Sequence, residues 1–283
     1  MRRFVKALTS AALGATVAFA ACEPKAEAQE IQLTGPLAGA KAVRKLRLYR
    51  EGRFEIAPTV SFSLLDEYRR TIIGGARLQY NFTDWLAVGV WGGYGFGFST
   101  DLTDQIDTVA QRNARTAINV NHTATGTAPF GDQVGRISWV AFPQVQFIPF
   151  RGKLALFQAL FVDADAYVFL GGGAAGLQER PDCGAAGQTS CSNPSSFTLG
   201  SRVAPAFTGG IGLNFWLADL VSLGIEYRAM PFSWNRGGFD SRGGPPSGNF
   251  PDNKVDSSDQ TFKFNQMLSI SVGVMLGDRK TSP

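Results

Sequence analysis

Apolar and polar residues alternate with a period of two along most of the chain, which is the pattern of β-strands that present two different faces. In the first such run Phe54 and Ile56 are apolar, whereas Glu55 between them is charged. Eight runs of this kind follow one another, and they cover approximately residues 54–64, 71–82, 86–98, 136–150, 154–171, 202–217, 221–230 and 262–276. The pattern therefore predicts an all-β protein of eight strands.

The connections between these runs alternate between short and long. The short ones are Thr83-Asp84, Arg151-Gly152-Lys153 and Ala218-Asp219, and the long ones span approximately residues 99–135, 178–201 and 233–260. In an antiparallel order all three long connections lie at one end of the sheet. This arrangement is typical of transmembrane barrels of the outer membrane, which have short periplasmic turns and long extracellular loops. The connection near Asp66-Glu67 is the exception, because it is short but lies at the long-loop end.

Alternation alone does not say which face points inward, since soluble barrels of the lipocalin kind alternate as well. Here one face is nearly free of charge, as lipid requires, whereas the other carries charged residues together with many glycines. The charged residues are Arg53, Glu55, Arg77, Asp163, Asp165, Glu226 and Arg228. Such a set is costly to bury in an apolar core but ordinary in the lumen of a membrane barrel. We therefore expect an eight-stranded antiparallel transmembrane β-barrel with these side chains inside.

The inward charges predict the state of the lumen. An eight-stranded barrel is only wide enough for its own side chains. We expect Arg77 and Arg228 to pair with inward carboxylates and to form a salt-bridged plug. The alternative is a selectivity ring in a narrow pore.

The N-terminus predicts export. A basic stretch, MRRFVK, precedes an apolar run at residues 7–20 and two small-residue cleavage candidates, Ala18-Phe19-Ala20 and Ala26-Glu27-Ala28. We expect a signal peptide at 1–28, a periplasmic segment at 29–52, the barrel at 53–277 and a short tail at 278–283. A membrane anchor or buried helix is one alternative, and a lipoprotein signal ending at Cys22 is another.

Two further cysteines lie in a polar connection. Cys183 and Cys191 are separated by seven residues in the segment QERPDCGAAGQTSCSNPSS. In an exported chain such a pair is typical of a disulfide.

Composition excludes several functional classes. Charged residues are 18% of the chain, and the net charge of +4 is spread along it, so a nucleic-acid partner is not expected. Beyond the N-terminus no run of 18 apolar residues occurs, which excludes helical membrane spans.

Candidate chemistry is sparse, and we expect no enzyme activity, cofactor or metal site. His122 is the only histidine, and its Asn- and Thr-rich neighbours are typical of a solvated loop. Asp101, Asp104 and Asp107 recur every third residue, which would cluster them on a helical turn around Ca²⁺, but the spacing is not that of an EF-hand and favours a solvated loop.

Two stretches resemble a known family. The segment Lys41 to Gly93, which includes FEIAPTVSFSLLDEYRRTIIGGARLQYNFTDWLAVGVWGG, resembles the opening of the myxobacterial-type outer-membrane β-barrel domain family. The segment Gly209 to Arg228, GGIGLNFWLADLVSLGIEYR, resembles it too, and is similar to OmpA-like barrels in general. The resemblance implies an integral protein of the outer membrane, without an established activity.

Together these observations predict a structural or surface-interaction role through the long loops. The expected partners are outer-membrane lipid, the outer-membrane assembly machinery and an unidentified extracellular partner. A narrow channel is the leading alternative, and an outer-membrane hydrolase is the third.

Overall fold

The computed structural model describes residues 50–109, 130–156, 160–191, 193–218 and 220–277. Eight long strands make up most of this region, and they are β1 (Phe54–Leu64), β2 (Arg69–Asn81), β3 (Leu86–Ser99), β4 (Arg136–Leu156), β5 (Leu160–Glu179), β6 (Gly200–Trp216), β7 (Val221–Trp234) and β10 (Thr261–Leu276). None of the helices in the described ranges is long and apolar enough to cross a membrane.

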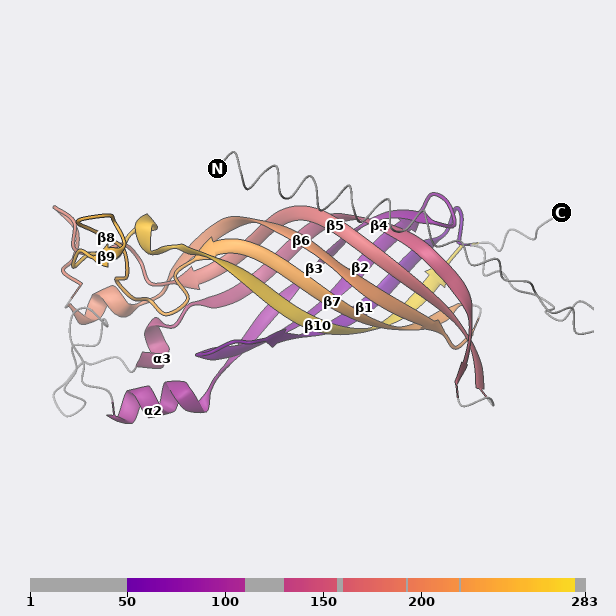
Figure 1. Ribbon diagram of the computed structural model, residues 1–283, viewed down its shortest axis with the longest axis horizontal. Coiled ribbons are helices and arrows are strands. Elements are labelled where there is room, and N and C mark those ends of the chain that lie inside the picture. The colour runs from indigo at the N-terminus through magenta and orange to yellow at the C-terminus, as the bar shows by residue number, and fades with distance from the viewer. Residues whose placement is uncertain (1–49, 110–129, 157–159, 192, 219, 278–283) are drawn as a thin grey trace, which may run out of the picture. The chain divides into compact units, whose positions relative to one another are not determined.

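The eight strands close into a single antiparallel barrel in the order β1-β10-β7-β6-β5-β4-β3-β2 (Figure 1). Closure depends on the pairing of the first strand with the last, which runs from Phe54 opposite Leu276 to Leu64 opposite Gln266. Because every strand has two neighbours, the barrel leaves no open sheet edge. The predicted fold class, an eight-stranded antiparallel barrel, is confirmed.

Burial follows the predicted alternation. In β1 the even-numbered residues are exposed, with Phe54 at 58% and Val60 at 45%, whereas Glu55 is 1% exposed and Ser61 is fully buried. The barrel wall therefore has an apolar outer face and an inner face of polar, small and charged residues.

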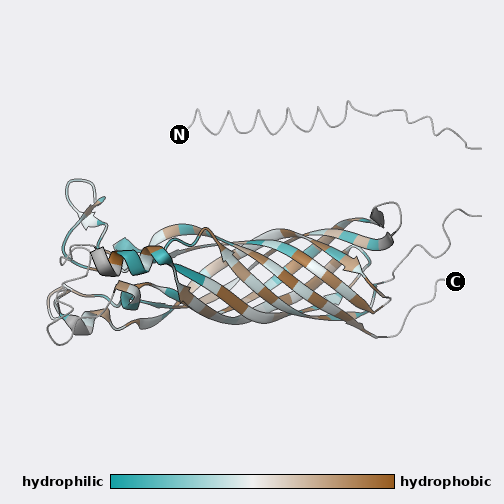
Figure 2. Cartoon of the chain, turned by 90° about the horizontal axis from the view of Figure 1, so that it is seen from below, coloured by the Kyte–Doolittle hydropathy of each residue, from teal (hydrophilic) through white to brown (hydrophobic). Residues whose placement is uncertain are grey.

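The two ends of the barrel differ (Figure 1). We call the end with the β2–β3, β4–β5 and β6–β7 connections the turn end, and the other the loop end. In Figure 2, hydrophilic residues are concentrated in the connections and helices of the loop end, whereas apolar residues alternate along the strands. At the loop end β3 is separated from β4, β5 from β6 and β7 from β10 by long connections.

The predicted turn at Arg151-Gly152-Lys153 is wrong. Those residues continue β4, and Lys153 lies opposite Asp163 in a hairpin that reaches Leu156 and Leu160. The register shifts between residues 147 and 150, which indicates a β-bulge, and Gly152 is part of the strand that follows it. A glycine beside charged residues resembles a turn in sequence, but the strand pairing continues past it.

The long connections also contain structure that the sequence did not predict. Helix α2 (Asp101–Val109) follows β3 directly, so the expected solvated loop at Asp101 and Asp104 is wrong for residues 101–109. Helix α3 (Phe130–Gln133) precedes β4, and β8 (Gly243–Gly244) pairs with β9 (Phe250–Pro251). Two 3₁₀ helices, η2 (Pro194–Phe197) and η3 (Ser257–Asp259), complete the described connections.

An apolar cluster fixes α3 to its neighbours. Phe130 is fully buried and its ring stacks on that of Phe239 with centroids 5.5 Å apart, while Tyr68 meets Phe130 edge to face at 5.3 Å. Tyr68 lies between β1 and β2, and Phe239 follows β7. Three connections that are far apart in the sequence are therefore packed together at the loop end.

Candidate functional site

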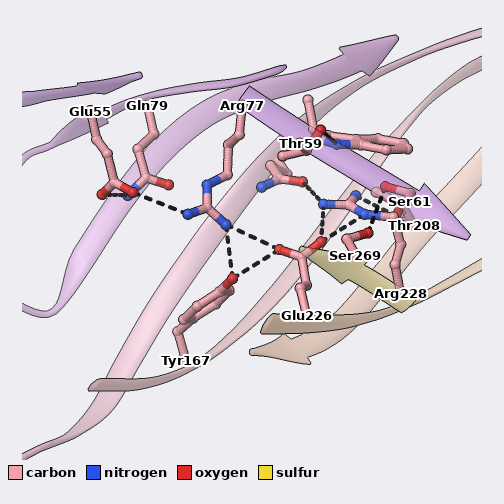
Figure 3. A network of polar contacts seen from close by, with 12 residues as sticks. Glu55, Thr59, Ser61, Arg77, Gln79, Tyr167, Thr208, Glu226, Arg228 and Ser269 are labelled. Carbon is pink, nitrogen blue, oxygen red and sulfur yellow. Dashed lines mark hydrogen bonds and ion pairs between the residues drawn. The ribbon is translucent and has the colours of Figure 1, made fainter. Parts of the chain in front are cut away.

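The inward charges gather in the turn-end half of the lumen, where Arg77 is central. Its guanidinium lies 3.1 Å from Glu55 Oε1 on the neighbouring strand and 3.1 Å from Glu226 Oε2 on β7 (Figure 3). All three side chains are buried. One buried cation thus links strands on different sides of the barrel, which an isolated hairpin could not achieve.

Tyr167 completes the contact between Arg77 and Glu226. Its hydroxyl accepts a hydrogen bond from Arg77 Nη1 at 2.8 Å and donates one to Glu226 Oε2 at 3.0 Å. Gly212 lies opposite Tyr167 in the β5–β6 pair. A Cβ atom at position 212 would lie 2.2 Å from Tyr167 Cζ, so a glycine is needed there for the phenol to enter the lumen.

Arg228 lies on the loop-end side of this network. Its guanidinium lies 2.7 Å from Glu226 Oε1 and donates to Thr208 Oγ1 at 2.9 Å and to Gln144 Oε1 at 3.0 Å. Two aromatic rings also contact it, with the Trp91 centroid 4.1 Å and the Phe169 centroid 4.3 Å from the guanidinium carbon. Hydrogen bonds and aromatic contacts together hold this arginine in place.

Arg50 lies at the turn end of the lumen, where the sequence interpretation did not expect an arginine. It is 1% exposed, forms a salt bridge with Asp165, and its guanidinium carbon lies 4.8 Å from the ring centroid of Trp216. Trp216 Nε1 also donates to Asp165. Arg50 precedes β1, in the segment expected to be periplasmic, so the strand alternation that pointed to the other charges gave no signal for it.

Two of the predicted lumen residues lie apart from this network. Arg53 is buried at the turn end, where its carbonyl accepts hydrogen bonds from the backbone and side chain of Asn81. Asp163 is half-buried and lies opposite Trp216 and Lys153, because the β4–β5 hairpin continues beyond the turn end. Among the inward carboxylates, Glu55 and Glu226 bind Arg77 and Arg228, and Asp163 is not their partner.

The loop-end half of the lumen contains a large apolar cluster, which the sequence interpretation missed. The cluster consists of the buried side chains of Ile73, Trp91, Ile137, Val140, Phe142, Ala175, Leu177, Ala204, Ala206, Met230, Phe232, Trp234 and Met267. We call this cluster the apolar plug. Trp91 and Phe142 stack within it, with centroids 6.0 Å apart. The signal was available, because Met230, Phe232 and Trp234 have the same strand parity as Glu226 and Arg228.

At the loop end, beyond the apolar plug, the buried side chain of Arg180 holds several connections together. Arg180 directly follows β5 and donates to the carbonyls of Cys191 at 2.8 Å, Gly238 at 3.1 Å and Ser196 at 3.2 Å. Burial lowers the pKa of Arg180 to about 10, although the carboxylates of Asp240 and Asp259 oppose the shift. The arginine remains charged near neutral pH and joins the β5–β6 connection to the β7–β10 connection.

Cys183 and Cys191 form a disulfide with a Cα–Cα distance of 5.1 Å. Cys183 also exchanges backbone hydrogen bonds with Val255, at 3.0 and 3.1 Å. The disulfide therefore lies where the β5–β6 and β7–β10 connections meet. We call these two connections, together with Arg180 and the disulfide, the loop-end cap.

Several sequence predictions lie outside the described residues. These are the signal peptide with Cys22, residues 29–49 of the expected periplasmic segment, His122 and the expected tail at 278–283. Asp107 lies in α2 but only its backbone is described, whereas Asp101 and Asp104 are in the first turn of that helix.

No protein-family model matches the chain, and no curated protein matches it. Solved structures with a similar fold are small barrels. The N-terminal β-barrel domain of Pseudomonas aeruginosa OprF is 9% identical with a TM-score of 0.35, and the match covers 80% of this chain and 98% of that one. Neisserial surface protein A (NspA) is 8% identical with a TM-score of 0.34, covering 82% and 99%. Ail, the attachment invasion locus protein of Yersinia pestis, is 12% identical with a TM-score of 0.32, covering 80% and 99%.

Proposed function

We propose that this chain is a non-enzymatic, non-conducting barrel of the outer membrane, which holds the loop-end cap on the cell surface as its structural or binding element. The observation that carries the proposal is the apolar plug above the charge network. Buried aromatic and aliphatic side chains from β2 to β10 pack together in the loop-end half of the lumen, and the ion-paired layer lies on the turn-end side of them. A continuous file of water through both layers would have to displace packed side chains.

The outer surface supports a membrane location. Apolar residues point outward on every long strand, among them Leu170 at 74% exposure, Val203 at 60% and Ile211 at 60%. Aromatic residues gather towards both ends of the wall. Phe54, Phe82 and Trp85 lie near the turn end, and Tyr94, Phe96, Phe98, Phe207, Phe262 and Phe264 lie towards the loop end, all more than half exposed. Two aromatic belts that flank an apolar band are the pattern of outer-membrane barrels.

The loop-end cap supports a binding role. Its two connections are held by Arg180, the disulfide and the Cys183–Val255 bridge, so its surface is largely ordered before any partner arrives. Preformed surfaces lose less conformational entropy on binding than flexible loops. We infer that this end faces outward and carries the interaction, and that the turn end faces the periplasm.

Planar-bilayer recording with the purified, detergent-folded protein tests the proposal. Folding is checked first by heat modification, in which the unboiled barrel migrates faster than the boiled chain. The expected result is insertion without stepwise currents. Steady ohmic, ion-selective currents from the unmodified protein would instead support the narrow channel, and recovery as a soluble periplasmic protein would overturn the membrane location.

A further inference from the structure

The β1–β2 pair opens before either strand ends. The two strands pair from Phe54–Tyr80 to Phe62–Ile72, but beyond this point β1 stays paired with β10 up to Leu64. Strand β2 likewise stays paired with β3 down to Arg69. In the gap the Thr71 N–H donates to Ser63 Oγ at 2.8 Å instead of to a carbonyl of β1. The wall of the barrel therefore splits at its loop-end rim.

A groove of about 760 Å³ occupies the split. Its apolar wall consists of the outward residues Phe62, Leu64, Ile72 and Phe98, of which Phe98 is 58% exposed. These side chains extend the apolar outer surface of β1, β2 and β3 as far as the loop end of the barrel. The groove is thus open to the same hydrocarbon that the barrel wall faces, and a flexible alkyl chain could bury apolar surface in it.

The rim of the groove carries charged side chains of both signs. Arg70 and Asp101 line it and are exposed, and within the described part of the chain neither side chain has an ion pair or hydrogen bond. Asp66 also lines the groove, but it is engaged by Arg236 at 3.2 Å and its side chain is 11% exposed. Counting only partners in the described ranges, one cation and one carboxylate without a partner therefore lie at the mouth of an apolar groove.

We propose that this groove binds a zwitterionic phosphoethanolamine lipid, with Arg70 on the phosphate, Asp101 on the ammonium and an acyl chain along Phe62 and Phe98. The inference rests on the proposed membrane location, with the loop end at the outer surface. A guanidinium forms charge-assisted, bidentate hydrogen bonds to phosphate, and an ammonium donates to a carboxylate. A purely anionic lipid would satisfy Arg70 but would be repelled by Asp101.

Native mass spectrometry of the full-length detergent-folded protein tests the site. Phosphatidylethanolamine is titrated against phosphatidylglycerol with identical acyl chains, and the variants are Arg70→Gln and Asp101→Asn. Arg242→Gln is the matched control, because Arg242 is exposed on the β7–β10 connection and does not line the groove. Heat modification verifies that each variant is folded.

We expect wild-type protein to retain phosphatidylethanolamine in preference to phosphatidylglycerol. Arg70→Gln should weaken binding of both lipids by about five- to tenfold, the scale of one charge-assisted contact. Asp101→Asn should weaken only phosphatidylethanolamine and abolish the preference, while Arg242→Gln should behave as wild type. Equal or tighter binding of phosphatidylglycerol by wild type, or unchanged binding by folded Arg70→Gln, would overturn the proposal. Ion currents would count against the non-conducting barrel but leave these lipid affinities unchanged, so the two proposals fail separately.

Discussion

The guanidinium of Arg228 lies over the indole ring of Trp91, 4.1 Å from the ring centroid, where the charged layer of the lumen meets the apolar plug. The contact lets a buried cation border an apolar cluster, because the ring face attracts positive charge while its edges pack against aliphatic groups. The contact between Arg228 and Trp91 thus connects the charged part of the lumen to the apolar plug.

Replacing Arg228 should destabilise the barrel. In Arg228→Ala the carboxylate of Glu226 keeps only Arg77 as its cation, and Thr208 and Gln144 lose their donor. Breaking a buried ion pair commonly costs roughly 3–5 kcal/mol. The midpoint of heat modification should fall clearly in Arg228→Ala and less in Arg228→Lys, which keeps the charge but not the planar fork. An Arg228→Ala midpoint equal to that of wild type would contradict this assignment.

Gly212→Ala should disturb the network without removing a charge. The new methyl group would overlap the ring of Tyr167 and push its hydroxyl away from Arg77 and Glu226. Gly152→Ala is the matched control, because nothing lies within 4 Å of a Cβ atom built at Gly152. Heat-modification midpoints of the two variants provide the measurement. We expect a lowered value for Gly212→Ala alone, and equal values would show that the barrel tolerates displacement of the phenol.

Acid should release the segment that precedes β1. Asp84 accepts hydrogen bonds from the backbone N–H groups of Arg50 at 2.9 Å and Glu51 at 3.3 Å, and lies 3.3 Å from Arg151. Burial opposes ionisation, but these contacts outweigh it and hold the pKa of Asp84 below its usual 3.8. Since the folded-state pKa is depressed, the stabilisation is complete above pH 3.8 and is lost as the pH falls through the lowered pKa.

Proteolysis of the N-terminal segment as a function of pH measures this release. Cleavage near Arg50 by an acid-active protease should increase below pH 3.8 in wild type. Asp84→Asn lacks the titrating group, so its cleavage should be raised at neutral pH and should vary less with acid. The same pH profile in both proteins would assign the effect to other carboxylates.

Arg180→Gln should loosen the loop-end cap while leaving the barrel folded. The substitution removes donors to the carbonyls of Cys191, Ser196 and Gly238, and a buried carbonyl without a donor costs about 1–3 kcal/mol. Limited proteolysis read by mass spectrometry should show faster cleavage within residues 181–199 and 235–260. Heat modification should remain near wild type, and a large fall in its midpoint would place the role of Arg180 in the barrel instead.

Much of the barrel follows from sequence alone. A strand places successive side chains on opposite faces, so the alternation in 54–64 identified both the strand and its inward Glu55. The same local rule placed Arg77, Glu226 and Arg228 on one face, and the scarcity of charge on the other face indicated lipid. These conclusions hold because backbone geometry fixes side-chain parity without reference to the rest of the chain.

Only the tertiary structure decided which of these residues meet. Whether Arg77 binds Glu226 or Asp165 depends on the stagger of all eight strands, which no single run encodes. Arg50 reaches Asp165 because a turn outside the alternating pattern folds back beneath the barrel, and Asp163 is displaced because the β4–β5 hairpin continues past a glycine that resembles a turn. The split between β1 and β2 arises in the same way, since it depends on each strand staying paired with its other neighbour. The face on which a side chain lies is set locally by the strand, whereas the residues that it contacts are set by closure of the whole barrel.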